Sequence, residues 1–417
     1  MKIDIFGVGY VGLTFALVLA KFKHNVKCWD IDKEKIKEYK KCNSDIKEPY
    51  IEDMLYEFQK NGNLNFEFYD SKNDINTELA IITIGTSLID NSSEESHSHI
   101  FKLVDELVSN NVKSILLRST VEIGTCRKLN KIYGDKCNFI FAPERTIEGK
   151  AIEELLSLPQ IAACNNQESK ILVEKCFSPL GVKIIYSDSW EEAELAKLIC
   201  NVYRDYNFSF ANLLLRITRE LSIDITKIID LVSLDYNRMP ILKAGPVSGP
   251  CLTKDSIILS NSIKDKDVKK VLLSSRKINN QIIKIASEDI ILIAKKYSIK
   301  SLLFIGLTFK NSPFTTDTRD SHSIELINNL KHKFKFNIYD PYTDKRAKTL
   351  FKDFFIDNLK NSCDELVILC NSQSWIINIF EENKYLKDSI KYWLYKPYLD
   401  LDKKNYFLGD HKKILNN

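Results

Sequence analysis

The feature that most constrains this chain is a glycine-rich turn close to its beginning. Residues 3–6 are rich in apolar side chains and run directly into Gly7, Gly9 and Gly12 of the sequence GVGYVG. A helical pattern and a second strand pattern follow, and that strand ends at Asp30. The order strand, glycine turn, helix, strand, acidic residue is the fingerprint of a dinucleotide-binding α/β fold.

Each part of this fingerprint has a physical role. The glycines permit a tight turn and a close approach of a pyrophosphate, and the helix predicted over 13–22 directs its N-terminus at the phosphates. Tyr10 and Val11, between the glycines, are expected to contact the cofactor. Asp30 can accept hydrogen bonds from ribose hydroxyls and would repel a 2′-phosphate, which favours NAD over NADP. Lys33 and Lys35 nearby weaken that preference. We therefore predict an NAD site.

Composition narrows the class of protein. The chain has 417 residues and a net charge of only +4 with scattered lysines, so it lacks the basic patch expected of a nucleic-acid-binding protein. No apolar run is long enough to span a membrane, and the early strand pattern leaves no room for a signal peptide. The ten cysteines form no C-x-x-C pair, which argues against a zinc site and a disulfide framework. We expect a cytoplasmic protein without a metal or a membrane partner.

Two polar segments have an ordinary structural interpretation. Asp32 is expected to cap a helix that begins at Lys33. His97 and His99 lie in a polar stretch, residues 90–99, and are expected to belong to a solvated loop rather than to a ligand pair.

Small polar residues follow two further predicted strands, 78–84 and 114–117. Thr86 follows the first of these strands and Thr120 the second. In an open α/β sheet the carboxyl ends of the strands line the ligand crevice, so both threonines are candidates for contact with cofactor or substrate. Ordinary capping at the start of a helix explains the same pattern equally well.

Two glutamates follow the strand pattern at 139–142. Glu144 and Glu148 are four positions apart and could supply paired carboxylates for acid–base chemistry. A solvated loop is the default interpretation of such charges, but their position after a strand favours a functional role.

A long helical pattern covers residues 190–221. Lys197, Asn201 and Arg204 follow one another by four and three positions and so share a face. A lysine and an asparagine one turn apart could stabilise a developing oxyanion, whereas the alternative is a solvent-exposed polar face. We interpret the helix as the connector between two lobes.

Residues 245–255, of sequence GPVSGPCLTKD, place a cysteine among turn-forming residues. Glycine and proline allow an unusual backbone path, and Lys254 favours the nucleophilic thiolate of Cys251. A buried, inert cysteine in a surface loop is the alternative.

A second α/β unit begins near residue 298. Its strand pattern at 301–305 leads to Lys310 and then to Arg319, both of which have the character of phosphate ligands, although each could be a surface cation. The sequence therefore predicts an α/β protein with two Rossmann-like doubly wound lobes, joined by a long central helix and a helical middle domain. The predicted domains are 1–189 for NAD binding, 190–297 for the helical middle with the cysteine loop, and 298–417 for the second lobe.

Together these motifs resemble those of the UDP-glucose/GDP-mannose dehydrogenases, NAD-dependent enzymes that oxidise the C6 alcohol of a nucleotide sugar to a carboxylate. The resemblance extends to about Cys370 and rests on five markers in order. They are STV with GT at 119–125, PER at 143–145, ELAK at 194–197, GPCL with KD at 249–255, and GLTFK with DTR at 306–319.

The resemblance implies roles for individual residues. Cys251 would trap an aldehyde as a thiohemiacetal, and the thioester formed by a second oxidation would be hydrolysed by water. Lys197 and Asn201 would stabilise the oxyanion, while Thr120 and Asp255 would order a water molecule, with Asp255 as a possible base. Glu144 and Glu148 match the family's paired glutamates, and Glu148 is the candidate for assisting hydrolysis.

The resemblance also implies binding contacts. Lys310 would hold the nucleotide diphosphate, Gly249 would lie against the substrate, and Arg319 would reach the cofactor pyrophosphate. A homodimer formed through the long helix is implied as well. Residues 142–146, with Arg145, differ from the form usual in UDP-glucose enzymes. Residues 201–207, with Arg204 and Asn207, resemble the form found in UDP-N-acetylhexosamine dehydrogenases. UDP-N-acetyl-D-mannosamine is therefore the favoured substrate, with UDP-N-acetylglucosamine and UDP-glucose as alternatives.

The chain departs from the family pattern at Ser87, at Thr253 and in its closing segment, which puts the contacts of the nucleotide lobe in doubt. Two other readings stay open. A β-hydroxyacid dehydrogenase of related fold would oxidise once and would leave the Cys251 loop unexplained. A nucleotide-sensing protein would bind NAD and a UDP-sugar without turnover.

Overall fold

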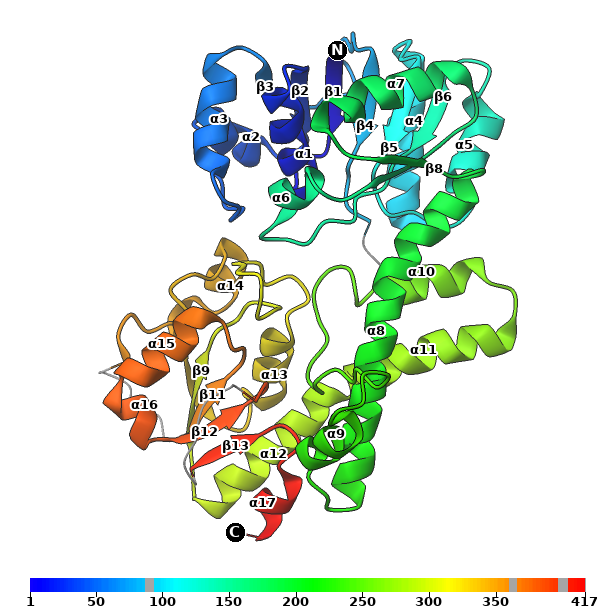
Figure 1. Cartoon of the computed structure of the whole chain (residues 1–417). Helices are drawn as coiled ribbons and strands as arrows, with labels where there is room; N and C mark the ends of the chain where they lie inside the picture. The colour runs from blue at the N-terminus through cyan, green and yellow to red at the C-terminus, as the bar shows by residue number, and fades with distance from the viewer. Residues whose placement is uncertain (87–93, 360–365, 397–403, 417) are drawn as a thin grey trace. The chain divides into compact units, whose positions relative to one another are not determined.

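The chain folds around two separate sheets. The computed structural model describes residues 1–86, 94–359, 366–396 and 404–416 (Figure 1). Contacts group them into two compact units, Met1–Cys200 with Ile257–Lys264, and Asn201–Ser256 with Asp265–Asn417. The α/β class predicted from the sequence is confirmed. The division into three domains stays a prediction, because the helical segment 190–297 is shared between the two units.

The first unit contains an eight-stranded sheet in the order β3-β2-β1-β4-β5-β6-β7-β8. Every neighbouring pair is parallel except β6 and β7. The strands are β1 Lys2–Phe6, β2 Asn25–Asp30, β3 Leu64–Phe68, β4 Leu79–Ile82, β5 Ser114–Leu117, β6 Asn138–Phe141, β7 Gln160–Cys164 and β8 Ile184–Tyr186. The strand order reverses between β1 and β4, and such a switch point is where doubly wound sheets bind their ligands.

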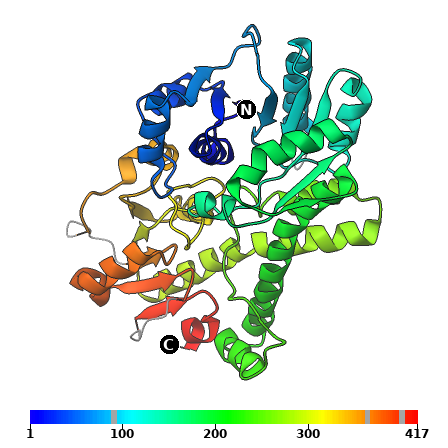
Figure 2. The same cartoon turned by 45° about the horizontal axis from the view of Figure 1, so that its top comes forward.

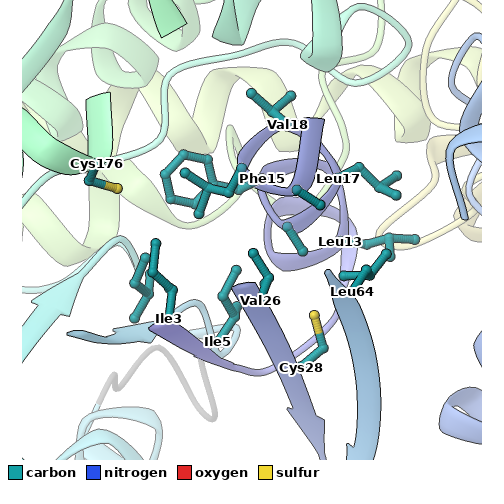
Figure 3. Close-up of a cluster of buried hydrophobic side chains, with 14 of the residues drawn as sticks. Ile3, Ile5, Leu13, Phe15, Leu17, Val18, Val26, Cys28, Leu64 and Cys176 are labelled. Carbon is teal, nitrogen blue, oxygen red and sulfur yellow. The ribbon is translucent and has the colours of Figure 1, made fainter. Parts of the chain in front are cut away.

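Helices cover both faces of this sheet. They are α1 Tyr10–Lys21, α2 Lys33–Lys40, α3 Ile51–Lys60, α4 Glu94–Ser109, α5 Thr125–Tyr133, α6 Ala151–Leu155 and α7 Gln167–Phe177, with a 3₁₀ turn at Ser178–Leu180. Helix α1 is apolar on all sides, and Gly12 to Ala20 are all buried, as expected for a helix enclosed by other elements. Figure 3 shows its side chains packed above β1 and β2, with a cysteine of α7 nearby.

The second unit contains a five-stranded parallel sheet in the order β10-β9-β11-β12-β13, drawn in yellow to red in Figure 1. The strands are β9 Ser301–Ile305, β10 Lys335–Tyr339, β11 Leu366–Leu369, β12 Ile390–Trp393 and β13 Asn405–Phe407. The helices are α9 Ile225–Ser233, α11 Lys266–Asn280, α12 Ile282–Lys296, α13 His322–Leu330, α14 Lys345–Leu350, α15 Ser374–Glu382, α16 Lys384–Asp388 and α17 His411–Asn416, with a 3₁₀ turn at Lys352–Phe354.

Two helices contain residues of both units. The 31-residue helix α8, Trp190–Glu220, is continuous in both views (Figures 1 and 2), and its predicted extent is confirmed to within one residue. The short helix α10, Asp255–Ser262, follows the cysteine loop.

The same hydrogen-bonded arrangement follows the first strand of both sheets. The first strand of each unit ends at a glycine with positive φ, Gly7 (91°) or Gly306 (82°). The backbone N–H that follows donates to an aspartate at the end of the neighbouring strand, which for Val8 is Asp30 at 2.8 Å. In the second unit Leu307 donates to Asp340 at 2.7 Å.

Local structure differs from the sequence-based expectation at the start of α4. Helix α4 begins at Glu94, so His97 and His99 are helical rather than part of a loop, and His97 is buried with its Nε2 accepting from the N–H of Glu122 at 3.2 Å. Helices α11 and α12 follow one another directly and meet at Gln281. Ser87 lies outside the described residues. Asp32 caps α2 as predicted.

Candidate active site

Gly9 and Gly12, at the start of α1, meet different surroundings. A Cβ at Gly12 would overlap the carbonyl oxygen of Gly7 and lie 2.6 Å from the Thr83 hydroxyl, so the helix can approach the strand only without a side chain. A Cβ at Gly9 would meet nothing within 4 Å. The space in front of Gly9, at the N-terminus of α1, is therefore open to a phosphate group, and the turn fits a dinucleotide.

Asp30 lies beside this turn, where the sequence predicted it. Its carboxylate accepts from the N–H of Val8 at 2.8 Å and from the Lys35 ammonium at 3.1 Å, and it is largely buried. Each carboxylate oxygen can accept more than one hydrogen bond, so Asp30 retains capacity for ribose hydroxyls. Lys35 brings a positive charge to the same point, as the sequence suggested.

The two predicted threonines at the strand ends are brought together. The Thr86 hydroxyl donates to the carbonyl of Thr120 at 2.9 Å, and Thr86 is buried. Ser119 anchors the same junction, because its hydroxyl donates to the carbonyl of Ile84 at 2.7 Å. The carboxyl ends of β4 and β5 thus form one surface, although the roles predicted for Thr86 and Thr120 stay predictions.

Glu144 is engaged in a buried ion pair that the sequence did not indicate. Its partner is Arg118, which is 1% exposed and also donates to the Gln160 side chain at 3.0 Å. The other Glu144 oxygen accepts from the N–H groups of Arg145 and Thr146 at 2.7 and 2.8 Å. Burial tends to raise the pKa of Glu144, but the Arg118 guanidinium and these N–H groups outweigh it and hold the pKa below its usual range. Glu144 is therefore an ionised anchor for its loop, and a role as a proton carrier stays a prediction.

The segment that carries Glu148 is held to the glycine turn. The N–H of Gly149 donates both to the Tyr10 hydroxyl, at 2.7 Å, and to the Glu48 carboxylate, at 2.5 Å. Glu48 is buried and also accepts from the N–H of Ala151 at 3.1 Å, which caps α6. Sequence analysis missed Glu48, since its neighbours in the sequence carry no signal of this distant contact.

The beginning of α8 is fixed by a buried acid. Glu194 is fully buried and accepts from the N–H groups of Gly124 at 2.5 Å and Cys126 at 2.9 Å, at the start of α5. Burial raises the pKa of Glu194, and the two N–H groups oppose that rise. Lys197, one turn later, is partly exposed. Sequence analysis included Glu194 in the ELAK motif at 194–197 but assigned it no role.

Asn201 and Asp255 are brought together, although 54 positions separate them. The Asn201 amide donates to Asp255 Oδ2 at 2.6 Å, and both residues are buried. The other Asp255 oxygen lies 3.8 Å from the Lys254 ammonium. Cys251 itself is exposed, and its carbonyl accepts from the N–H of Asp255 at 3.1 Å. The predicted nucleophile therefore lies at an accessible turn beside a buried amide–carboxylate pair.

Gly249 has a steric reason for being glycine. Its φ is +94°, and a Cβ there would penetrate the ring of Phe309, which approaches within 2.7 Å at Cε2. The loop is also fixed by the N–H of Gly249, which donates to the carbonyl of Asp320 at 3.2 Å. Lys310 follows Phe309 directly and is partly exposed.

Three predicted ligand residues make contacts within their own unit, and a fourth is exposed. The guanidinium of Arg319 is paired with Asp317, its Nε at 2.8 Å, and that of Arg145 donates to the carbonyl of Pro159. Asn207 donates to the carbonyl of Tyr203 at 2.7 Å, and Arg204 is exposed on α8. Their assignment to cofactor or substrate stays a prediction.

The described residues offer neither a cluster suited to a metal ion nor a helix suited to a membrane. No group of three histidine, cysteine or carboxylate side chains among them could hold a metal ion. Within the same residues, no helix is both long and apolar enough to cross a membrane.

Models of two domains of one protein family match most of the chain. The model of the UDP-glucose/GDP-mannose dehydrogenase family, NAD binding domain, matches residues 1–181, and the model of the same family's central domain matches residues 191–281.

Relatives with two different names match at similar identity. A UDP-glucose 6-dehydrogenase of Rickettsia bellii is 28% identical over 90% of this chain and 89% of its own length. A UDP-N-acetyl-D-mannosamine dehydrogenase of Methanocaldococcus jannaschii is 27% identical over 100% of this chain and 93% of its own. Among solved structures, a UDP-D-ManNAc dehydrogenase from Pyrococcus horikoshii superposes with a TM-score of 0.84 at 21% identity, covering 99% of this chain and all of the other. That likeness concerns the fold.

Proposed function

The chain belongs to the UDP-glucose/GDP-mannose dehydrogenase family of NAD-dependent oxidoreductases, and we propose that it oxidises the C6 alcohol of UDP-N-acetyl-D-mannosamine to the carboxylate in two steps. One observation carries the proposal. The exposed Cys251 lies in a turn whose last residue, Asp255, is held by Asn201 at 2.6 Å. An accessible thiol fixed next to an amide donor is the arrangement that covalent trapping of an aldehyde needs.

The cofactor and the chain divide the chemistry. NAD⁺, when bound at the glycine turn, accepts a hydride from C6 in each of the two oxidations. Between them the Cys251 thiolate adds to the aldehyde carbon, a C–S bond forms, and the carbonyl oxygen takes up the negative charge. Lys197 and Asn201 project from α8 one turn apart, and we assign them to that oxygen.

Release of the product requires water. The second oxidation leaves a thioester on Cys251, and attack by water breaks the C–S bond, returns the thiolate and gives the carboxylic acid. We assign activation of this water to Glu148, with Thr120 and Asp255 ordering it. Glu144 is given a supporting part, because its carboxylate is already engaged by Arg118.

Binding contacts complete the proposal. Asp30, Thr86 and Arg319 are assigned to the cofactor, while Lys310 and Gly249 are assigned to the nucleotide sugar. Arg145, Arg204 and Asn207 are the residues on which the preference for an N-acetylhexosamine rests. UDP-N-acetylglucosamine and UDP-glucose are the alternative substrates, the latter favoured by relatives such as the UDP-glucose 6-dehydrogenase of Rickettsia bellii.

The test is NADH formation from UDP-ManNAc, UDP-GlcNAc, UDP-glucose and GDP-mannose, each as the limiting reactant. We expect two NADH per UDP-ManNAc, and no net oxidation to the carboxylate in Cys251→Ala. Two NADH from UDP-glucose alone would retain the mechanism and overturn the assignment of Arg145, Arg204 and Asn207. No NADH from any of the four sugars, with NAD binding intact, would contradict the enzymatic proposal.

We also propose a homodimer formed through α8. Five apolar side chains, Tyr203, Tyr206, Phe210, Leu213 and Ile217, follow one another by three and four positions, and each is between 37% and 67% exposed. This spacing places them in one stripe on the helix, the pattern by which two helices pack against each other. A second copy of the chain would remove the stripe from water.

A further inference from the structure

The loop that carries Cys251 is fixed by a buried guanidinium on another element. Arg276, on α11, is 3% exposed. Its Nη2 donates to the carbonyl of Val247 and its Nη1 to the carbonyl of Leu252, both at 3.1 Å. These carbonyls lie on either side of Cys251 in the sequence, so one planar group spans the turn that presents the thiol.

A buried acid holds this guanidinium in place. Asp205, on α8, is fully buried and accepts from Arg276 Nη1 at 2.5 Å. The same carboxylate accepts from the Asn279 amide at 2.7 Å and from the Ser256 hydroxyl at 3.0 Å. A buried ion pair persists only when its remaining hydrogen-bonding capacity is satisfied, and here the remaining donors belong to α11 and α10. The orientation of Arg276 is therefore determined by three helices.

The loop is also held from the second lobe. Tyr395 donates to the carbonyl of Pro246 at 2.7 Å, and the Ser248 hydroxyl lies 2.7 Å from Nδ1 of the buried His322. Contacts to Pro246, Ser248 and Gly249 therefore come from the lobe, and those to Val247 and Leu252 come from α11. Of these contacts, only the two hydrogen bonds from Arg276 join a residue before Cys251 to a residue after it.

We propose that Arg276, oriented by Asp205, is a positioning residue that sets where the Cys251 thiol meets the substrate aldehyde. The inference rests on the proposed function, in which Cys251 traps that aldehyde. The first oxidation removes a hydride from C6 before any bond to sulfur exists, so it does not require a correctly placed thiol. The C–S bond and the second oxidation do require it, and a displacement of about 1 Å can slow such a step roughly 100-fold.

The decisive variant is Arg276→Lys. Lysine retains the charge opposite Asp205 but has no planar fork to reach two carbonyls at once. We expect NADH per sugar to fall from two towards one, with the escaped aldehyde captured by semicarbazide. A loss of folded protein alone would lower the rate and leave this ratio at two. A ratio of two in Arg276→Lys, without trapped aldehyde, overturns the proposal.

Asn280→Ala is the matched control. Asn280 is exposed and accepts from Nε of the same guanidinium at 2.9 Å, whereas the hydrogen bonds to the carbonyls of Val247 and Leu252 come from Arg276. Its ratio should stay at two. If Arg276→Lys does not fold, the double variant Arg276→Met with Asp205→Leu removes both buried charges together, which proteins tolerate better, and the same ratio is measured.

A second readout separates this inference from the proposed function. Alkylation of Cys251 by iodoacetamide, followed by peptide mass in a Cys200→Ser background, needs no turnover. The rate should change in Arg276→Lys and match the parent in Asn280→Ala. Equal rates in all three proteins contradict the positioning role even if no sugar is oxidised. Suppose that the parent gives no NADH, while the alkylation rate changes in Arg276→Lys and not in Asn280→Ala. That result would contradict the proposed function and leave the positioning role of Arg276 intact.

Discussion

At the scale of single residues, two glycines of the same motif, Gly9 and Gly12, are glycine for different reasons. Gly12 is glycine because the chain's own backbone occupies the space of a Cβ. Gly9 faces open space and has a φ of −76°, which any residue can adopt. A requirement for glycine at Gly9 therefore comes from the ligand, whereas the requirement at Gly12 comes from the fold.

Alanine substitutions distinguish the two requirements. Gly12→Ala should lower the unfolding midpoint without any ligand, by about 3–10 °C, because overpacking costs roughly 1–3 kcal/mol. Gly9→Ala should keep the midpoint within about 2 °C but weaken NAD binding about tenfold or more. Thermal unfolding and calorimetric titration with NAD measure the two effects. Equal loss of stability in both variants would show that Gly9, too, is needed by the fold.

At the scale of elements, the buried Asp340 joins the ends of β9 and β10, and its pKa is raised. Asp340 is 3% exposed, and burial raises its pKa to about 6 against the opposing effect of the N–H groups of Leu307 and Tyr342. The folded chain thus binds this proton more tightly than the unfolded chain. The associated stabilisation is complete below about pH 4 and is lost as the pH rises through about 6.

Asp340→Asn removes this dependence. A shift of about two pKa units corresponds to roughly 3 kcal/mol, so the variant should gain stability relative to the parent by up to that amount between pH 4 and pH 7. Unfolding midpoints measured across this range test the expectation, with the exposed Asp353→Asn as control. A difference between variant and parent that does not change with pH would contradict it.

The elements were largely predictable from the sequence, and the contacts between them were not. Strands at 114–117 and 301–305 were predicted with the bounds that they have, because runs of apolar residues end at turn-forming residues. The start of α4 was missed because polar residues at a helix N-terminus resemble a loop.

Partners of buried polar residues were beyond the sequence for a different reason. Arg276 and Asp205 are 71 positions apart, and each, read along its own helix, resembles an ordinary charge on a solvent-facing side. Arg118 and Glu144, which follow β5 and β6, are also distant in the sequence and form a buried pair. Only the packing of distant elements shows that such charges are buried and paired. Candidate nucleophiles can therefore be found from local patterns, whereas the residues that orient them cannot.

At the scale of the whole molecule, the apolar stripe on α8 bears on the number of chains that associate. The side chains from Tyr203 to Ile217 remain partly in water in a single copy, and each buried side chain of this kind contributes roughly 1.5–3 kcal/mol when fully covered. A helix with such a stripe is suited to an interface with a second copy of itself.

Charge placed in the stripe should separate the two copies. Phe210→Glu is expected to shift the mass found by light scattering from about twice the 48.2 kDa of one chain to that of one chain. Tyr56→Glu, at a 60% exposed position on α3, should leave the mass unchanged. A parent that is already monomeric at micromolar concentration would contradict the dimer.

The way in which Arg276 holds the cysteine loop has an evolutionary consequence. Arg276 binds the carbonyl oxygens of Val247 and Leu252, which every amino acid possesses, and it makes no demand on their side chains through these bonds. Substitutions at these two positions can accumulate without releasing the hydrogen bonds that fix the turn. The loop can thus drift in sequence, and adapt to a different sugar, while the thiol is presented from the same place.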